Sequence, residues 1–115
     1  MYQPIILPHF HKQLKRYVKK YYDFKQEVVS SLEKFNKDVA GGLGGNVYKV
    51  RVRTKGLSKG KSKSFRIIVL VIEIEKFVVP ITIYFKGDKE SITKQEINRH
   101  LEKISFELEL EELMK

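Results

Sequence analysis

Basic side chains alternate with apolar side chains along the segment VYKVRVR, residues 47–53. In an extended strand this spacing places Lys49, Arg51 and Arg53 on one face. A further arginine, Arg66, opens the next apolar run. A guanidinium presents a planar fork of donors that matches two phosphate oxygens, and a lysine crowded by other cations has a lowered pKa and approaches a useful general base. These residue types therefore predict a face that binds phosphate groups and moves protons beside them.

The distribution of charge also indicates a polyanionic ligand. The chain has a net charge of +9, and no acidic residue lies between Asp38 and Glu73. The C-terminal segment 107–115 has the opposite sign, and its acidic part, residues 107–112, could fold back on the basic face. A basic surface that only aids solubility is the alternative, but charge on both a strand and a loop is more typical of a nucleic-acid binder. The acid-free segment contains eight basic residues: Lys49, Arg51, Arg53, Lys55, Lys59, Lys61, Lys63 and Arg66.

The composition argues against several other classes of function. The chain has no cysteine and three histidines, His9, His11 and His100, which we expect to be ordinary surface or helix-end residues rather than zinc ligands. The glycine-rich segment 41–45, GGLGG, lacks the lysine and hydroxyl residue that complete a P-loop. The longest apolar run, residues 67–72, is too short to cross a membrane, and no secretion signal is visible. We expect one soluble, cytoplasmic domain over residues 1–115, with no metal or small-molecule cofactor.

The first third of the chain is expected to be mainly helical. A short strand is predicted over residues 3–7, and apolar residues then recur at helical spacing from Phe10 to Val39. Asp23 followed by Gln26 is a capping-box pattern, which predicts two helices with a break between them and a shared apolar core stripe. The glycine-rich segment is expected to end the second helix and to act as a connector.

The centre of the chain has the period-two pattern of strands. Strands are predicted over residues 47–53, 65–75 and 77–85, because β-branched and aromatic residues alternate or run continuously there. Lys76 is expected to form a tight turn between the last two strands. Pro80 indicates an edge position or a bulge, since proline cannot donate a ladder hydrogen bond.

A final helix completes the expected architecture. Thr93 with Glu96 forms a second capping box before the apolar stripe of this helix, and the tail 106–113 fits either a strand or a helix. The predicted fold class is α+β: an N-terminal strand and a helical hairpin packed on an antiparallel sheet with a three-strand meander. The opposite face of the sheet, with the basic residues of its first meander strand, is expected to be open to solvent.

The segments YKVRVRTKG, SFRIIVLVI and ITIYFKGDKESITKQEI, in this order and spacing, resemble the RelE/ParE superfamily of type II toxins. They are most similar to the HigB-like branch, in which a Gly/Lys/Ser-rich loop precedes an arginine-led strand and a Tyr-x-Lys-x-x-Lys segment precedes the last helix. The resemblance extends from residue 4 to residue 104. It implies a RelE-like fold and a toxin held inactive by a cognate antitoxin protein. In RelE-like and HigB-like members it also implies an endoribonuclease that cleaves mRNA on the translating ribosome.

The same resemblance implies site residues. Lys49 and Arg51 match the two basic strand residues of RelE-like toxins, and Arg66 matches their phosphate-stabilising arginine. Cleavage by attack of the RNA 2′-oxygen needs a base, stabilisation of the phosphorane and an acid, and these toxins achieve it without a histidine pair. Tyr84 would stack on a base or donate a proton, and Lys86 would supply charge. The remaining expected RNA contacts are Arg53, Lys55, Lys59, Lys61, Lys63 and Lys89.

The chain also departs from the family pattern. The stretch KGDKESITKQEI, residues 86–97, lacks the further arginine and tyrosine of RelE-like members, so the general acid is left open, and Asp88 is the acidic residue that would fit there. The basic loop 55–66 is expected to contact ribosomal RNA beside the bound message. Two alternatives remain: a ParE-like inhibitor of DNA gyrase, which shares the fold, and an RNA-binding module without activity.

Overall fold

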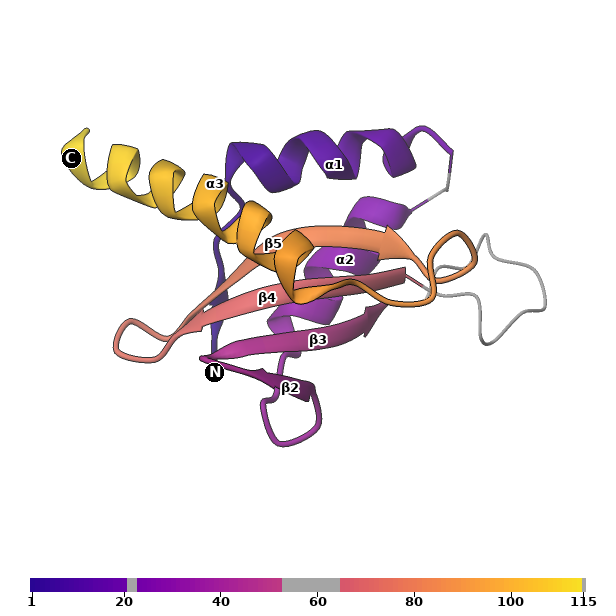
Figure 1. The fold of residues 1–115 in the computed structure, drawn as a ribbon, viewed down its shortest axis with the longest axis horizontal. Helices are drawn as coiled ribbons and strands as arrows, with labels where there is room; N and C mark the ends of the chain where they lie inside the picture. Colours follow the sequence, from indigo (N-terminus) through magenta and orange to yellow (C-terminus); the bar gives the residue numbers. More distant parts are fainter. Residues whose placement is uncertain (21–22, 53–64, 115) are drawn as a thin grey trace.

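The computed structural model describes residues 1–20, 23–52 and 65–114. Within these ranges it has a mixed α+β architecture, which confirms the predicted fold class (Figure 1). No helix in the described ranges is long and apolar enough to span a bilayer. The elements are β1 (Gln3–Pro4), α1 (Pro8–Val18), α2 (Phe24–Glu33), β2 (Gly41–Gly44), β3 (Val47–Val52), β4 (Phe65–Ile72), β5 (Phe77–Phe85) and α3 (Lys94–Leu113).

The strands form one sheet in the order β1-β5-β4-β3-β2. The pairs β3–β4 and β4–β5 are antiparallel, which confirms the predicted meander. β1 is shorter than expected and pairs in parallel with β5, so the sheet is mixed rather than wholly antiparallel. β4 ends at Ile72, and residues 73–76 form the turn to β5. Lys76 has a φ of 58° in this turn, which confirms its predicted role.

Helices cover both faces of the sheet. α1 and α2 pack on the face that includes Phe65 and Ile67. α3 packs on the other face, where Ile97 and Ile104 join Ile68 in a second core cluster. Figure 1 shows α2 behind the sheet and α3 crossing in front of it. The expectation of an open second face is therefore wrong where α3 lies, because the apolar stripe of α3 needs burial and β4 and β5 present apolar side chains to it.

The helical pair ends earlier than the apolar spacing predicts. α2 begins directly after Asp23, which confirms the break, but Asp23 has a φ of 61° and its side chain makes no capping hydrogen bond, so the capping box predicted there is wrong. α2 ends at Glu33. Just beyond it, the Asn36 side chain accepts a hydrogen bond from the Asp38 N–H at 2.9 Å, a local turn that competes with helix. Val39 is consequently 83% exposed and is not a core residue, contrary to the prediction.

The glycine-rich segment forms a strand, so its predicted role as a helix stop and connector is wrong. Gly41–Gly44 is β2 and pairs with β3 in an antiparallel hairpin. Gly44 and Gly45 have φ values of 93° and 59° and lead, with Asn46, into β3. The left-handed freedom of glycine is thus used in the hairpin turn instead of at a helix end.

α3 begins at the predicted capping box and continues through the ambiguous tail. The Thr93 side chain accepts from the Glu96 N–H, and the Glu96 carboxylate accepts from the Thr93 N–H. Residues 106–113 are helical, and the C-terminal end of α3 projects past the end of the sheet where β4 turns into β5 (Figure 1). The acidic segment therefore does not fold back on the basic face. Its Glu107 carboxylate instead accepts from the His9 N–H, at 3.0 and 3.1 Å.

β5 contains a bulge at the position that Pro80 indicates. The register with β4 passes from Val69 opposite Pro80 to Ile68 opposite Thr82, so Ile81 is the extra residue. A bulge accommodates proline because it interrupts the ladder hydrogen bonds. The prediction of a bulge is confirmed, and every side chain of β5 after it is shifted by one position relative to strict alternation.

A glutamine of α1 satisfies the backbone of β5 beside this bulge. The buried Gln13 Oε1 accepts from the Thr82 hydroxyl at 2.7 Å and from the Ile83 N–H at 3.2 Å. Its Nε2 donates to the Ile81 carbonyl at 3.3 Å. β1 pairs with Phe77 and the residue after it, so in the described ranges no strand covers the outer edge of β5 at these groups. The Gln13 amide therefore makes the hydrogen bonds that a neighbouring strand would otherwise make with β5.

We expect Gln13→Leu to lower the free energy of unfolding by about 1–3 kcal/mol, because it leaves buried donors and acceptors of β5 without partners. Chemical denaturation of the purified chain measures this loss. Gln95→Leu, at an exposed position of α3, is the matched control and should change stability by no more than about 0.5 kcal/mol. Equal losses in the two variants would show that the Gln13 hydrogen bonds do not stabilise the fold.

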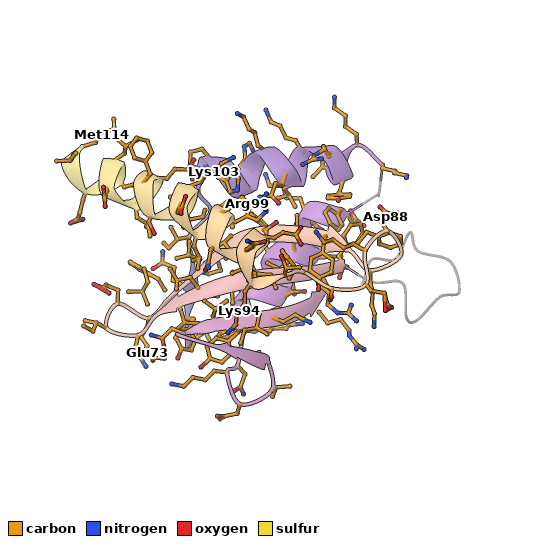
Figure 2. All side chains as sticks on the ribbon, viewed as in Figure 1. Glu73, Asp88, Lys94, Arg99, Lys103 and Met114 are labelled. Carbon is orange, nitrogen blue, oxygen red and sulfur yellow. The ribbon has the colours of Figure 1, made fainter. Side chains whose placement is uncertain are left out.

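Two histidines join α1 to α3. His9 Nε2 lies 2.7 Å from His100 Nδ1, so one ring nitrogen donates and the other accepts. His9 is at the start of α1, which agrees with the expectation of a helix-end residue, but neither His9 nor His100 is an ordinary surface residue, because both are half-buried. Partial burial lowers the pKa of His9, and the Lys103 charge adds to this effect. Partial burial and then the His9 charge lower the pKa of His100. Lys103 lies on the side of α3 towards α1 (Figure 2).

This histidine pair predicts a stability that falls as the pH decreases below 6.5. In the unfolded chain these histidines have the ordinary pKa of 6.5, whereas in the folded chain the pKa of His9 and of His100 is lower. The unfolded state therefore binds protons more readily. The contribution of the pair to the free energy of unfolding is fully present above pH 6.5 and is lost as the pH decreases towards the lowered pKa values. Urea midpoints measured across this range for the wild type and for His100→Gln test the prediction. The variant should lose less on acidification, whereas His11→Gln, at an exposed position, should behave as the wild type. Parallel curves for all three proteins would contradict the prediction.

Two carboxylates with lowered pKa values, Glu73 and Glu96, titrate at a lower pH than the histidine pair. The Glu73 carboxylate accepts from Tyr2, Lys37 and Lys76, and these hydrogen bonds lower its pKa from 4.5 to about 2. A hydrogen bond from Lys89 is the main cause that lowers the pKa of Glu96 to about 2. Both groups stabilise the fold above 4.5, and that contribution is lost only as pH falls from 4.5 towards 2.

Candidate active site

Three side chains form a row across the meander. Arg51 on β3 is the register partner of Arg66 on β4, and Arg66 is the register partner of Tyr84 on β5. Direct cross-strand neighbours have Cβ atoms roughly 4.5–5.5 Å apart and share a face. Arg51 is exposed, whereas Arg66 and Tyr84 are 6% and 7% exposed. The sheet thus brings together three of the predicted site residues, two cations and a phenol, from three separate strands.

Burial changes the electrostatics of this row. The pKa of Arg66 is lowered mainly by burial and further by the charge of Arg51. An arginine remains a cation at neutral pH all the same, so Arg51 and Arg66 place two like charges next to each other on this face. Burial raises the pKa of Tyr84, although the Arg66 charge opposes this. Tyr84 is therefore a protonated phenol at neutral pH and a donor.

The Tyr84 hydroxyl is buried and makes no hydrogen bond within the described part of the chain. Buried polar groups in proteins are almost always hydrogen-bonded, and leaving one without a partner costs about 1–3 kcal/mol. The Tyr84 hydroxyl is thus a buried donor on the strand next to Arg66, with no hydrogen-bond partner among the described residues.

Lys49 lies on the same face, two residues before Arg51 on β3 and opposite Ile68. It is half-buried and lines an open groove of about 760 Å³ at the edge of β3 beyond the end of β2. Arg51 and Arg66 line the same groove, so it connects three of the predicted catalytic residues. Its other polar side chains come from the end of α2 and the turn after it: Ser31, Lys34 and Asn36.

The predicted lysines of the last β–α connection lie after Tyr84. Lys86 is half-buried directly after β5. Lys89 forms an ion pair with Glu96 at the start of α3, so part of its charge is already neutralised. The predicted contacts in the basic loop, Arg53, Lys55, Lys59, Lys61 and Lys63, lie outside the described residues.

Sequence patterns did not predict the polar residues that the turn after α2 contributes to the groove. Lys34 and Asn36 flank Phe35 just after the end of α2 and fit no motif. Lys94 and Asn98 of α3, which line a second groove, are likewise ordinary polar positions of an amphipathic helix. Tertiary packing brings these four residues to the grooves. Their only feature in the sequence is that they are polar positions outside the apolar stripes, which predicts exposure and not a place in a groove.

The sequence profile of a protein family described as "RelE toxin of RelE / RelB toxin-antitoxin system" matches residues 9–115. The chain belongs to the RelE toxin family. A comparison with curated proteins found no match. The family match confirms the resemblance to the RelE/ParE superfamily, while the HigB-like branch stays a prediction.

Membership of the RelE family supplies the biological setting. The chain is the toxin component of a toxin–antitoxin system, and a cognate antitoxin is the partner that this membership implies. The RelE match includes β2 to β5 and α3, and so includes the Arg51–Arg66–Tyr84 row. It assigns no role to individual residues of that row.

Proposed function

We propose that this RelE-family toxin is a ribosome-dependent endoribonuclease that cleaves translated mRNA. The observation that carries the proposal is the row of Arg51, Arg66 and Tyr84. In this row Arg66 lies between a second arginine and a buried, protonated phenol whose hydroxyl has no hydrogen-bond partner among the described residues. Stabilisation of developing phosphoryl charge by arginine, with a proton donor at hand, is what cleavage by a 2′-hydroxyl requires.

The proposed reaction needs no metal ion. Lys49 removes the proton of the 2′-hydroxyl, whose oxygen attacks the adjacent phosphorus. The bond to the 5′-oxygen of the next nucleotide breaks, which leaves a 2′,3′-cyclic phosphate on one product. Arg66, held by burial, and Arg51 stabilise the charge on the non-bridging oxygens. Tyr84 donates its proton to the leaving 5′-oxygen, and Lys86 adds positive charge close to this step.

The ribosome would supply most of the docking energy. The chain carries a net charge of +9, and the basic loop with Arg53, Lys55, Lys59, Lys61 and Lys63, together with Lys89, would contact phosphates of ribosomal RNA and of the message. Lysine contacts to phosphate position a partner without reading its sequence, so the message would be presented by translation rather than selected by this loop.

Induced expression of the chain without its antitoxin tests the proposal, with new ends of one reporter message mapped by primer extension. We expect growth arrest and discrete new ends, both lost on co-expression of the antitoxin. The ends should also disappear from a matched message that lacks its ribosome-binding site. Growth arrest with intact messages would favour the ParE-like gyrase inhibitor, and no arrest would favour an RNA-binding module without activity.

A further inference from the structure

A second groove, of about 570 Å³, lies between the β2–β3 hairpin and the start of α3. This volume is within the range of small-molecule sites, roughly 300–1,000 Å³. Figure 2 shows Lys94 at the start of α3, on the side of the helix near β3. The walls are mainly apolar and the polar side chains are few: Leu43, Ile92 and Ile97 form walls, and Lys49, Lys94 and Asn98 are polar.

The charge of this groove selects an anionic ligand. Two lysines line it, and no acidic side chain does so among the described residues. The N-terminal end of the 20-residue helix α3 adds partial positive charge close to Lys94. Apolar walls between cations suit a flat, apolar group that carries phosphate at its side, which is the chemistry of a nucleotide.

The groove shares one lining residue with the groove of the candidate active site. Lys49 lines both this groove and the groove that contains Arg51 and Arg66. A chain of nucleotides whose phosphate lies on the arginines would therefore pass Lys49 and reach the space beside α3. No other described residue lines both grooves.

We propose that this groove binds the base of a nucleotide next to the cleaved bond and that Asn98 reads its edge. The inference rests on the proposed ribonuclease function and names a specificity subsite for it. The base packs between Leu43 and the apolar side of α3, and its flanking phosphates lie towards Lys49 and Lys94. An asparagine amide offers one donor and one acceptor side by side, which pair well with one base edge and poorly with others.

The first test is methyl NMR of the full chain with the four nucleoside 5′-monophosphates, and ribose 5-phosphate as the ligand without a base. We expect saturable shifts of the Leu43, Ile92 and Ile97 methyl groups with one or two of the nucleotides. Ribose 5-phosphate should bind at least about tenfold more weakly. Asn98→Ala should weaken the preferred nucleotide about five- to tenfold, and Gln95→Ala, an exposed amide of α3 outside the groove, should change nothing.

The second test maps the bases next to cleavage sites in cells that express the wild type, Asn98→Ala or Gln95→Ala. Asn98→Ala should flatten the base preference at one position while total cleavage falls less than about tenfold. Equal binding of ribose 5-phosphate, no methyl shifts with any nucleotide, or an unchanged base preference in Asn98→Ala would each overturn the subsite. If the wild type cleaves no message, the ribonuclease proposal fails while the NMR test still decides whether the groove binds a base.

Discussion

Arg66→Ala is expected to slow message cleavage by about 100- to 1,000-fold, the usual effect of removing one preorganised donor from a developing oxyanion. Arg66 is the most buried cation of the site, and burial strengthens its interaction with phosphate oxygens relative to water. Cleavage of a defined message by purified ribosome complexes, followed by single-turnover kinetics, measures the rate.

Two further variants show whether charge or geometry matters. Arg66→Lys retains a positive charge but loses the planar fork of donors, so it should recover part of the lost rate and not all of it. Arg99→Ala removes an exposed arginine of α3 (Figure 2) and should leave the rate within about twofold, since surface charges act weakly. A rate for Arg66→Ala close to that of Arg99→Ala would exclude Arg66 from the reaction.

Tyr84→Phe is expected to separate activity from stability. Loss of the proton donor should lower the rate by about 100-fold or more, as is typical of general acid catalysis. The free energy of unfolding should stay the same or rise, because the hydroxyl that is removed is buried and has no partner among the described residues. Single-turnover kinetics and urea denaturation on the same preparation give both quantities.

Tyr48→Phe is the matched control for this change. Tyr48 is a half-buried tyrosine that packs on the α1/α2 side of the sheet, in contact with the ring of Phe35. Its loss should not alter the cleavage rate. If Tyr84→Phe retained full activity, the proton donor would be another group, and Tyr84 would serve only to pack against α3.

The sequence predicted those parts of the fold that local pattern determines. Alternation and β-branched runs located β3, β4 and β5, and the capping box at Thr93 located the start of α3, because these signals lie within a few residues of each other. β2 was missed because a strand of glycines and one leucine has no hydrophobic period, and only its pairing with β3 makes it a strand.

The sequence named Arg51, Arg66 and Tyr84 but could not predict how the strands arrange them. Strict alternation from Val78 would place Tyr84 on the α1/α2 face of the sheet, away from Arg66. The extra residue Ile81 reverses the phase, and Tyr84 becomes the register partner of Arg66. Proline at position 80 indicated the bulge, but its consequence for the row of Arg51, Arg66 and Tyr84 depends on cross-strand register, which no local pattern contains.

The Gln13 side chain occupies the outer edge of β5 in place of a neighbouring strand, and this has a consequence for self-association. The central strand β4 contains IIVLVI, residues 67–72, a run with high β-propensity and no charge, which is the kind of segment that nucleates aggregation when its edges are exposed. β3 and β5 flank it on both sides. The outer edge of β5 is covered by β1 and then by the Gln13 amide. At the other side of the sheet, the edge strand β2 is short and irregular. Covered edges and short, irregular edge strands both discourage edge-to-edge pairing in natural sheets. Aggregation of this toxin should therefore follow its global unfolding and not precede it.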